Sequence, residues 1–112
     1  MVYKLFIIHV IKKEVKRMIH YNLLKLKEGA DVDAVFEESK KVYAELEAEL
    51  DFLHDAVVKK CVTVRDSNAD IMMIMAIDSP EYLQSYLQHP KHVTLATGMK
   101  DLIAARISFD AE

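Results

Sequence analysis

Hydrophobic and polar residues alternate along residues 18–26. The odd-numbered residues from Ile19 to Leu23 fall on one side, and the even-numbered residues from His20 to Leu26 fall on the other. Strand side chains point alternately to the two faces of a sheet, so this pattern predicts a β-strand. The segment around Gly29 ends it.

A helical pattern follows from about Asp31 or Asp33. Apolar residues recur with helical spacing from Val35 to Leu50, and charged residues occupy the positions between them. This arrangement predicts an amphipathic helix whose N-terminus is favoured by the aspartates and whose charged face is solvated.

Two further strands are predicted before the next helix. Residues 56–64 alternate and are rich in β-branched side chains, and residues 65–68 have the composition of a turn. Residues 70–77 are apolar on both faces. If helices cover one side of the sheet, such a strand needs a second cover on the other side, and a partner subunit would supply it.

The last part of the chain predicts two helices and a strand. Ser79 and Pro80 suit a helix start, with a buried stripe formed by Tyr82, Leu83, Tyr86 and Leu87. A third helix is expected over residues 90–104 and a strand over residues 106–110. The order βαββααβ predicts an α+β, ferredoxin-like unit with an antiparallel four-stranded sheet, in which the second helix of the repeat is split at Pro90.

Residues 1–17 differ from the rest. An apolar run is followed by a basic one, an order that does not suit a signal peptide, and the run is too short to span a bilayer. The segment is interpreted as an extra strand, as a basic helix on a membrane surface, or as a mis-assigned start before a native Met18. Codons for Lys13-Glu14-Val15 can form a bacterial ribosome-binding sequence, which favours the third interpretation. A membrane partner is expected only if residues 1–17 are native.

Composition narrows the class of protein. The 112 residues have a net charge of −3, with basic residues dispersed, so nucleic acid is not expected as a partner. The single cysteine, Cys61, cannot form an internal disulfide, and a cytoplasmic location is expected. Cys61 is predicted to be a buried, inert thiol in the middle of a strand.

The segment from Tyr86 to His92 carries the candidate chemistry. Pro90 predicts a helix start, which places His92 in the first turn. The helix N-terminus disfavours imidazolium, so His92 is expected to tend toward the neutral form that a general base needs. Tyr86 would lie near the end of the preceding helix, where its side chain could face His92. The alternative is structural, with His89 as the cap, His92 packed against a neighbour and Tyr86 in the core.

Polar residues on the first and last strands are predicted to join this segment. If the relevant faces point toward the helices, His20, Asn22, Arg106, Ser108 and Asp110 converge with Tyr86 and His92. An ordinary hydrophobic core contains fewer polar side chains than this, because each buried polar group needs a hydrogen-bond partner. A satisfied network is the alternative, with Arg106 bonded to Asp110 or to another acidic residue and His92 bonded to Tyr86. Met73 and Met75 are either a deformable pocket wall or core filler.

Cofactors are not expected. His89 and His92 are three residues apart, a spacing that suggests a metal site. However, no nearby carboxylate or cysteine has the sequence spacing of a zinc ligand. Glycine-rich phosphate loops are also absent from the sequence, which has two glycines.

Four segments together resemble the stress-responsive A/B barrel (Dabb) family. They are Met18 to Gly29, Arg65 to Asp70, Tyr86-x-x-His89-Pro90-x-His92 and Arg106-x-x-x-Asp110. The resemblance covers residues 18–110, and it implies a dimeric α+β barrel in which the open sheet faces of two subunits pack together. It therefore implies a homodimer and a domain that begins near Met18.

The resemblance also implies two hypotheses about function. One plant member of the family cyclises a linear polyketide thioester, with a histidine base and an assisting tyrosine, and those positions match His92 and Tyr86. His20 and Asp110 also match positions that line the cavity of that enzyme, whereas Asn22, Arg106 and Ser108 are polar where its edge strands are apolar. The predicted pocket lining consists of His20, Asn22, Met73, Met75, His89, Arg106, Ser108 and Asp110. The first hypothesis is a homodimer that binds a small organic molecule, with no assigned activity. The second is a cofactor-independent cyclase or isomerase acting beside a carbonyl.

Overall fold

The computed structural model describes residues 17–112. The elements, in chain order, are β1 (Met18–Leu26), α2 (Val32–Glu49), β2 (Leu53–Lys60), β3 (Ile71–Ile77), a 3₁₀ turn (Pro80–Tyr82), α3 (Leu83–Leu87), α4 (Pro90–Met99), a second 3₁₀ turn (Lys100–Leu102) and β4 (Ile103–Ala111). The three interpretations of residues 1–17 concern a segment that lies, except for residue 17, outside the described residues.

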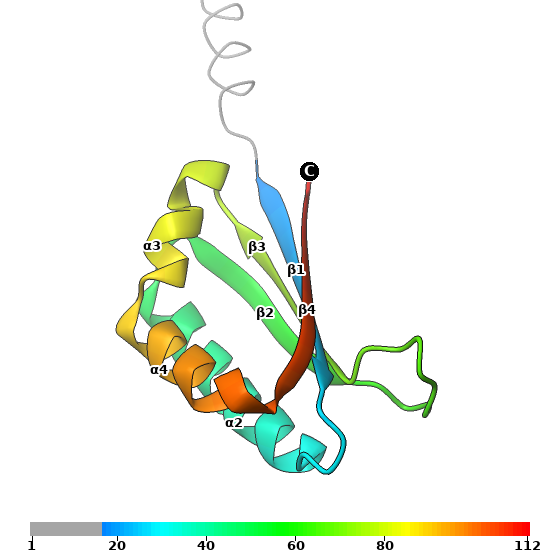
Figure 1. Ribbon diagram of the computed structural model, residues 1–112. Helices are drawn as coiled ribbons and strands as arrows, with labels where there is room; N and C mark the ends of the chain where they lie inside the picture. The colour runs from blue at the N-terminus through cyan, green and yellow to red at the C-terminus, as the bar shows by residue number, and fades with distance from the viewer. Residues whose placement is uncertain (1–16) are drawn as a thin grey trace, which may run out of the picture.

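The four strands form one antiparallel sheet in the order β2-β3-β1-β4. The helices lie together on one side of the sheet, so its other side is open (Figure 1). This is the predicted ferredoxin-like fold, with the second helix of the repeat split at Pro90 into α3 and α4. No helix within residues 17–112 has both the length and the apolar character needed to cross a bilayer.

Helix α2 begins where its sequence provides a cap. The Asp31 carboxylate accepts a hydrogen bond from the Ala34 N–H at 3.0 Å, which satisfies one of the unpaired donors of the first turn. The buried stripe of the helix includes Val35, Val42 and Leu46, and it packs on the sheet side as the periodicity predicted.

The second strand lies earlier than predicted. It runs over Leu53–Lys60, not residues 56–64, because β3 begins only at Ile71. The Cys61 N–H still donates to the Asp70 carbonyl, but no strand lies opposite residues 62–64. The register shifts between His54 and Val57, and Asp55 between them has a φ of 54°, which marks a bulge. Residues 61–70 form a loop that projects beyond the sheet, away from the helices (Figure 1).

The C-terminal third also differs from the predicted boundaries. Helix α4 ends at Met99 rather than at residue 104, because residues from Ile103 onward pair with β1 as a nine-residue strand. The expected helix at Ser79 is a 3₁₀ turn followed by the short α3, and Ser79 makes no side-chain cap. In the predicted stripe Tyr86 is buried, whereas Tyr82 is exposed.

The two sheet faces follow the strand period. Even-numbered residues of β1 and odd-numbered residues of β3 face the helices and form the core with α2. The opposite face carries Ile19, Tyr21, Leu23, Ile74, Ile107 and Phe109. Ile107 is 65% exposed and Phe109 is 63% exposed, so this face is the apolar surface without a cover that the β3 pattern predicted.

Candidate functional site

The two histidines of the Tyr86 to His92 segment have different positions. His89 is the N-cap of α4: its Nδ1 accepts from the Lys91 N–H at 3.1 Å, and its Nε2 lies 3.7 Å from Glu49 Oε2 on α2. His92 lies in the first turn of α4, and its Nδ1 is 2.9 Å from the Leu87 carbonyl oxygen. His89 is therefore turned toward α2, so the structure does not bring it into the site with His92.

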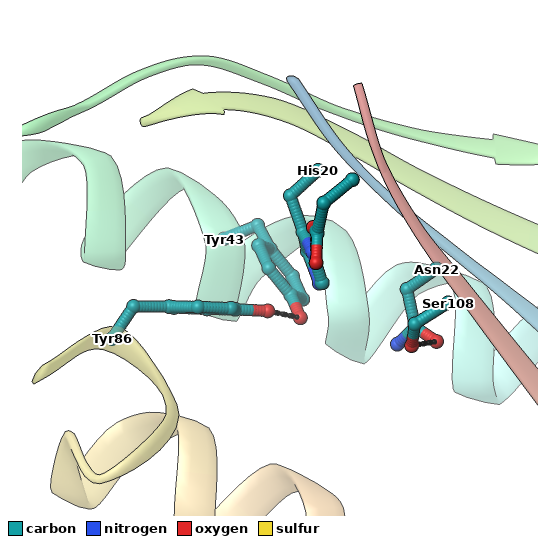
Figure 2. Close-up of polar contacts among 6 residues, drawn as sticks. His20, Asn22, Tyr43, Tyr86 and Ser108 are labelled. Carbon is teal, nitrogen blue, oxygen red and sulfur yellow. Dashed lines mark hydrogen bonds and ion pairs between the residues drawn. The ribbon is translucent and has the colours of Figure 1, made fainter. Parts of the chain in front are cut away.

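Tyr86 lies at the centre of an aromatic cluster. Its ring centroid is 4.8 Å from that of His92, 5.7 Å from that of His20 and 6.2 Å from that of Tyr43. The Tyr86 and Tyr43 hydroxyl oxygens are 2.5 Å apart, and Figure 2 shows Tyr86 reaching across from α3 to meet Tyr43 of α2. Tyr86 is fully buried. Burial, followed by the Tyr43 hydroxyl, raises the pKa of Tyr86 far above its usual value, so the phenol keeps its proton at neutral pH.

His20 and Asp110 face each other across β1 and β4. They are direct register partners, and His20 Nδ1 is 2.5 Å from Asp110 Oδ1. The His20 ring is buried, whereas the Asp110 side chain is 38% exposed. A carboxylate only accepts hydrogen bonds, so His20 carries a proton on Nδ1, which is how carboxylates commonly orient imidazoles.

The next pair along the same two strands is polar as well. The Ser108 hydroxyl donates to the Asn22 side-chain oxygen at 3.4 Å, as Figure 2 shows, and the Asn22 amide donates to the Met73 sulfur at 3.6 Å. Met73 and Met75 are almost completely buried beside these residues. Both methionines therefore occupy the core positions of β3, where they pack under Asn22 and His20.

The β4 members of the predicted cluster are not buried. Arg106, Ser108 and Asp110 are on the helix-facing side of β4, but they are exposed because β4 is an edge strand that extends past the helices. The proposed pairing of Arg106 with Asp110 is also wrong, since Asp110 bonds His20. Likewise, His92 contacts the Tyr86 ring without a hydrogen bond, because its Nδ1 is held by Leu87.

The pKa of His92 is lowered, in the direction that the helix N-terminus predicted. The main cause, however, is burial, which disfavours imidazolium. The bond to the Leu87 carbonyl opposes the shift, and the charges of Arg106, His20 and His89 add to it. A carbonyl only accepts, so neutral His92 holds its proton on Nδ1 and presents an unprotonated Nε2.

Both site imidazoles thus leave Nε2 without a hydrogen bond among the described residues. Throughout residues 17–112, no fully buried side-chain nitrogen or oxygen lacks a partner. The two Nε2 atoms therefore touch solvent, and both imidazole rings pack against the Tyr86 ring. Such an arrangement can accept a hydrogen bond or a proton from a ligand that enters at the open edge of β4.

Two clefts border α4, and neither is lined by His20, Tyr86 or His92. One of about 610 Å³ runs between α2 and α4, with Val35, Val42, Leu95 and Met99 among its lining residues. The other, of about 420 Å³, lies between α4 and β4 and is lined by Ala96, Thr97, Lys100, Ile103 and Arg106. Within residues 17–112, no group of three or more histidine, cysteine, aspartate or glutamate side chains is arranged to hold a metal ion.

Sequence reasoning missed Tyr43, Thr97 and Lys100. Tyr43 is on the buried stripe of α2, and only its hydroxyl hinted at more than packing. Its partner is 43 residues away in the chain, so no local spacing could reveal the pair. In the sequence, Thr97 and Lys100 resemble ordinary solvated helix positions. Only the structure shows that they line a cleft together with the first residues of β4.

The prediction for Cys61 was wrong. It follows the end of β2, and its thiol is exposed in the loop, where it contacts Thr63 and Asn68. Hydrogen bonding with Thr63 is the main cause of the lowered pKa of this thiol.

Comparisons with known proteins agree with the fold. The model of the stress responsive A/B barrel domain matches residues 18–112. A dimeric ferredoxin-like protein of unknown function from Bacteroides fragilis aligns with a TM-score of 0.74 and 20% identity, over 86% of this chain and 95% of that one. A Dabb family protein from Mesorhizobium loti aligns with a TM-score of 0.60 and 12% identity, over 86% and 95%.

A more distant structure is similar as well. An antibiotic biosynthesis monooxygenase-like protein from Nitrosomonas europaea aligns with a TM-score of 0.71 and 10% identity, over 85% of this chain and 88% of that one. At these identities the structural likeness establishes the fold alone. A comparison with curated protein sequences found no significant match.

Proposed function

The chain belongs to the stress-responsive A/B barrel domain family, and from that premise we propose that it is a homodimer that binds a small organic molecule between β4 and α4. The ligand site contains His20, Tyr86 and His92, and it opens at the exposed edge of β4. Metals and organic cofactors have no role in this proposal.

One observation carries the proposal of a ligand site. The imidazoles of His20 and His92 both pack against the buried Tyr86 ring, and each leaves Nε2 unbonded and in contact with solvent. Because each Nε2 is accessible to solvent, it is available to accept a hydrogen bond from a ligand. The cleft of about 420 Å³ at the β4 edge is in the size range of small-molecule sites.

A second candidate function is proton transfer beside a carbonyl group. The His92 tautomer and lowered pKa favour it, because they supply a neutral base at pH 7. In this reaction Nε2 takes a proton from the carbon next to the carbonyl, the electron pair of that C–H bond forms the C=C bond of an enolate, and the π pair of the carbonyl moves to its oxygen. In an isomerisation, the imidazolium returns the proton to another atom of the substrate. In a cyclisation, the enolate carbon attacks a second carbonyl, the first carbonyl re-forms, and the imidazolium gives its proton to the new alkoxide oxygen.

Tyr86 is the candidate donor to the developing oxyanion. The hydroxyls of Tyr43 and Tyr86 share one hydrogen bond. If Tyr43 donates, the hydrogen of Tyr86 is free for the substrate oxygen. A phenol whose pKa is raised by burial remains protonated, as an oxyanion donor must.

Homodimer formation is proposed through the open sheet face. Phe109 and Ile107 leave more than half of their surfaces exposed there, and Phe109 packs beside Tyr21 at a centroid distance of 6.4 Å. Exposed apolar patches of this kind mark association surfaces. The proteins from Bacteroides fragilis and Thermobifida fusca with this fold are dimeric. The free Cys61 thiol suits the reducing cytoplasm, which is the proposed location.

A thermal-shift screen tests the ligand site. The native chain and His92→Ala are compared against β-dicarbonyl, phenolic and acyl-thioester compounds. A ligand at about 100 times its dissociation constant adds about 2.7 kcal/mol to the unfolding free energy, which raises Tm by several degrees for a domain of this size. The expected result is a shift that His92→Ala weakens.

His89→Asn is the matched control for this screen. It removes the neighbouring imidazole but keeps a side chain that caps α4 well, so ligand shifts should persist. If no compound raises Tm, or if His92→Ala leaves every shift intact, the ligand site is not at His92. The enzymatic candidate is tested separately, by deuterium incorporation from D₂O next to the carbonyl of a bound acyl thioester. His92→Gln should abolish incorporation, and incorporation equal to the protein-free rate would exclude this reaction for that substrate.

A further inference from the structure

Arg106 occupies a distinctive place beside the proposed ligand site. It is opposite Leu24 in the β1–β4 register, on the same face as the His20–Asp110 and Asn22–Ser108 pairs. Its side chain is exposed, and no hydrogen bond or ion pair engages the guanidinium among residues 17–112. The five N–H donors of Arg106 are therefore available to a ligand on the helix side of β4.

The cleft that Arg106 lines is positively charged. Lys100 lines it from the 3₁₀ turn after α4, and the Thr97 hydroxyl comes from the last part of α4. The remaining lining residues, Ala96 and Ile103, are apolar, and no carboxylate lines this cleft. Two cations, a hydroxyl and an apolar wall are a combination that suits the charged end of a small organic anion.

This cleft adjoins the aromatic cluster. Ala96 follows His92 by one turn of α4, a rise of about 5.4–6 Å. Along β4, Arg106 is two residues from Ser108 and four from Asp110, on the same face. Burial is the main cause of the lowered pKa of His92, and the Arg106 charge lowers it further, so that charge acts at the histidine.

We infer that Arg106 and Lys100 bind the negatively charged group of the ligand, and that the ligand is a short oxo acid with its carboxylate at this cleft and its carbonyl beside His92 and Tyr86. This inference rests on the proposed function, and it adds the chemical class of the molecule. A planar guanidinium binds a carboxylate through two parallel N–H···O bonds, which fixes orientation as well as position.

The test compares acetoacetate with its neutral methyl ester by isothermal titration calorimetry. The two compounds share the carbonyl groups and differ in the charge. For the native chain, the acid is expected to bind about tenfold more tightly than the ester, as befits a charge-assisted pair at a partly exposed site. In Arg106→Gln this preference should fall to within about twofold while the ester binds as before, and Lys100→Gln should show a smaller loss.

Lys59→Gln is the matched control, because it removes one positive charge from the exposed β2 and leaves the cleft unchanged. The control should retain the tenfold preference. Equal binding of acid and ester, or a preference that survives Arg106→Gln, would overturn the inference while leaving the ligand site in place. If neither compound binds and His92→Ala changes nothing in the thermal-shift screen, the proposed function itself fails. Methyl phosphate, titrated in the same way, distinguishes the source of the anion: tighter binding than acetoacetate would overturn the carboxylate assignment.

Discussion

The helix-covered face and the open face of the sheet use the same four strands to build different surfaces. On the covered face, Leu24 and Ile77 are almost completely buried, and polar residues occur in bonded pairs such as His20–Asp110. On the open face, Phe109 and Ile107 are exposed side by side with Tyr21 and Leu23. Because adjacent residues of a strand point in opposite directions, one strand can contribute to a folding core with a ligand site and to an association surface.

The largest expected effect concerns two adjacent residues of β1. Leu24→Ala removes a fully buried side chain from the covered face, so it should lower the unfolding free energy by about 2–5 kcal/mol. Leu23→Ala, on the half-buried open face, should cost the monomer much less. Urea denaturation at low protein concentration measures both. Equal losses would mean that the two faces do not differ as described.

The next effect is on association. Phe109→Glu places a charge on the open face, and it should raise the dimer dissociation constant by at least about 100-fold, which is about 2.7 kcal/mol. Sedimentation equilibrium measures the constant. Val93→Glu is the control, since Val93 is an exposed apolar residue on α4 and its substitution should leave the dimer intact. A dimer that tolerates Phe109→Glu would place the interface elsewhere.

A smaller effect is expected in the Tyr43–Tyr86 pair. Tyr86→Phe leaves the buried Tyr43 hydroxyl without its partner, so it should lower stability by about 1–2 kcal/mol, and Tyr43→Phe should do the same. The double variant should cost clearly less than the sum, because it removes both hydroxyls together. Thermal or chemical denaturation of the four proteins gives the coupling. Additive losses would show that the hydroxyls do not bond each other.

The smallest effect is the pH dependence from His92. The pKa of His92 in the folded protein is below its ordinary value of 6.5, so the unfolded state binds more protons as the pH falls through 6.5. The contribution of His92 to stability is therefore complete above pH 6.5 and is lost progressively toward lower pH. NMR titration of the His92 ring should give a midpoint below 6.5, and His92→Gln should flatten the stability profile between pH 6.5 and the folded pKa. A midpoint above 6.5 would contradict the neutral base.

Much of the fold could be predicted from the sequence because its signals are local. The alternation in β1 gave its bounds and its two faces, and Pro90 gave the start of α4 with His89 as the cap. The limits of β2 and β4 were wrong for a physical reason, since a strand extends only as far as a neighbour pairs with it. Residues 61–64 alternate like a strand but have no neighbouring strand to pair with.

The candidate site could be predicted only in part. Spacing brought His20, Tyr86, His92 and Asp110 together on the right side of the sheet, because each is fixed by an element with a clear period. The hydrogen-bond partners could not be foreseen: Tyr86 bonds Tyr43 rather than His92, and His92 bonds a backbone carbonyl. The exposure of Arg106 could not be foreseen either, because it depends on the position of β4 at the edge of the sheet.

The most direct test of the central claim is to map a neutral β-dicarbonyl on the protein by NMR. Acetylacetone is titrated into the isotopically labelled native chain, and the backbone and side-chain shifts of both sheet faces are followed. The account predicts saturable changes at His92, Tyr86, His20 and Ile103, with Tyr21 and Phe109 unaffected. Saturable changes confined to the open face, or no saturable change at His92, would contradict a ligand site on the helix-covered side.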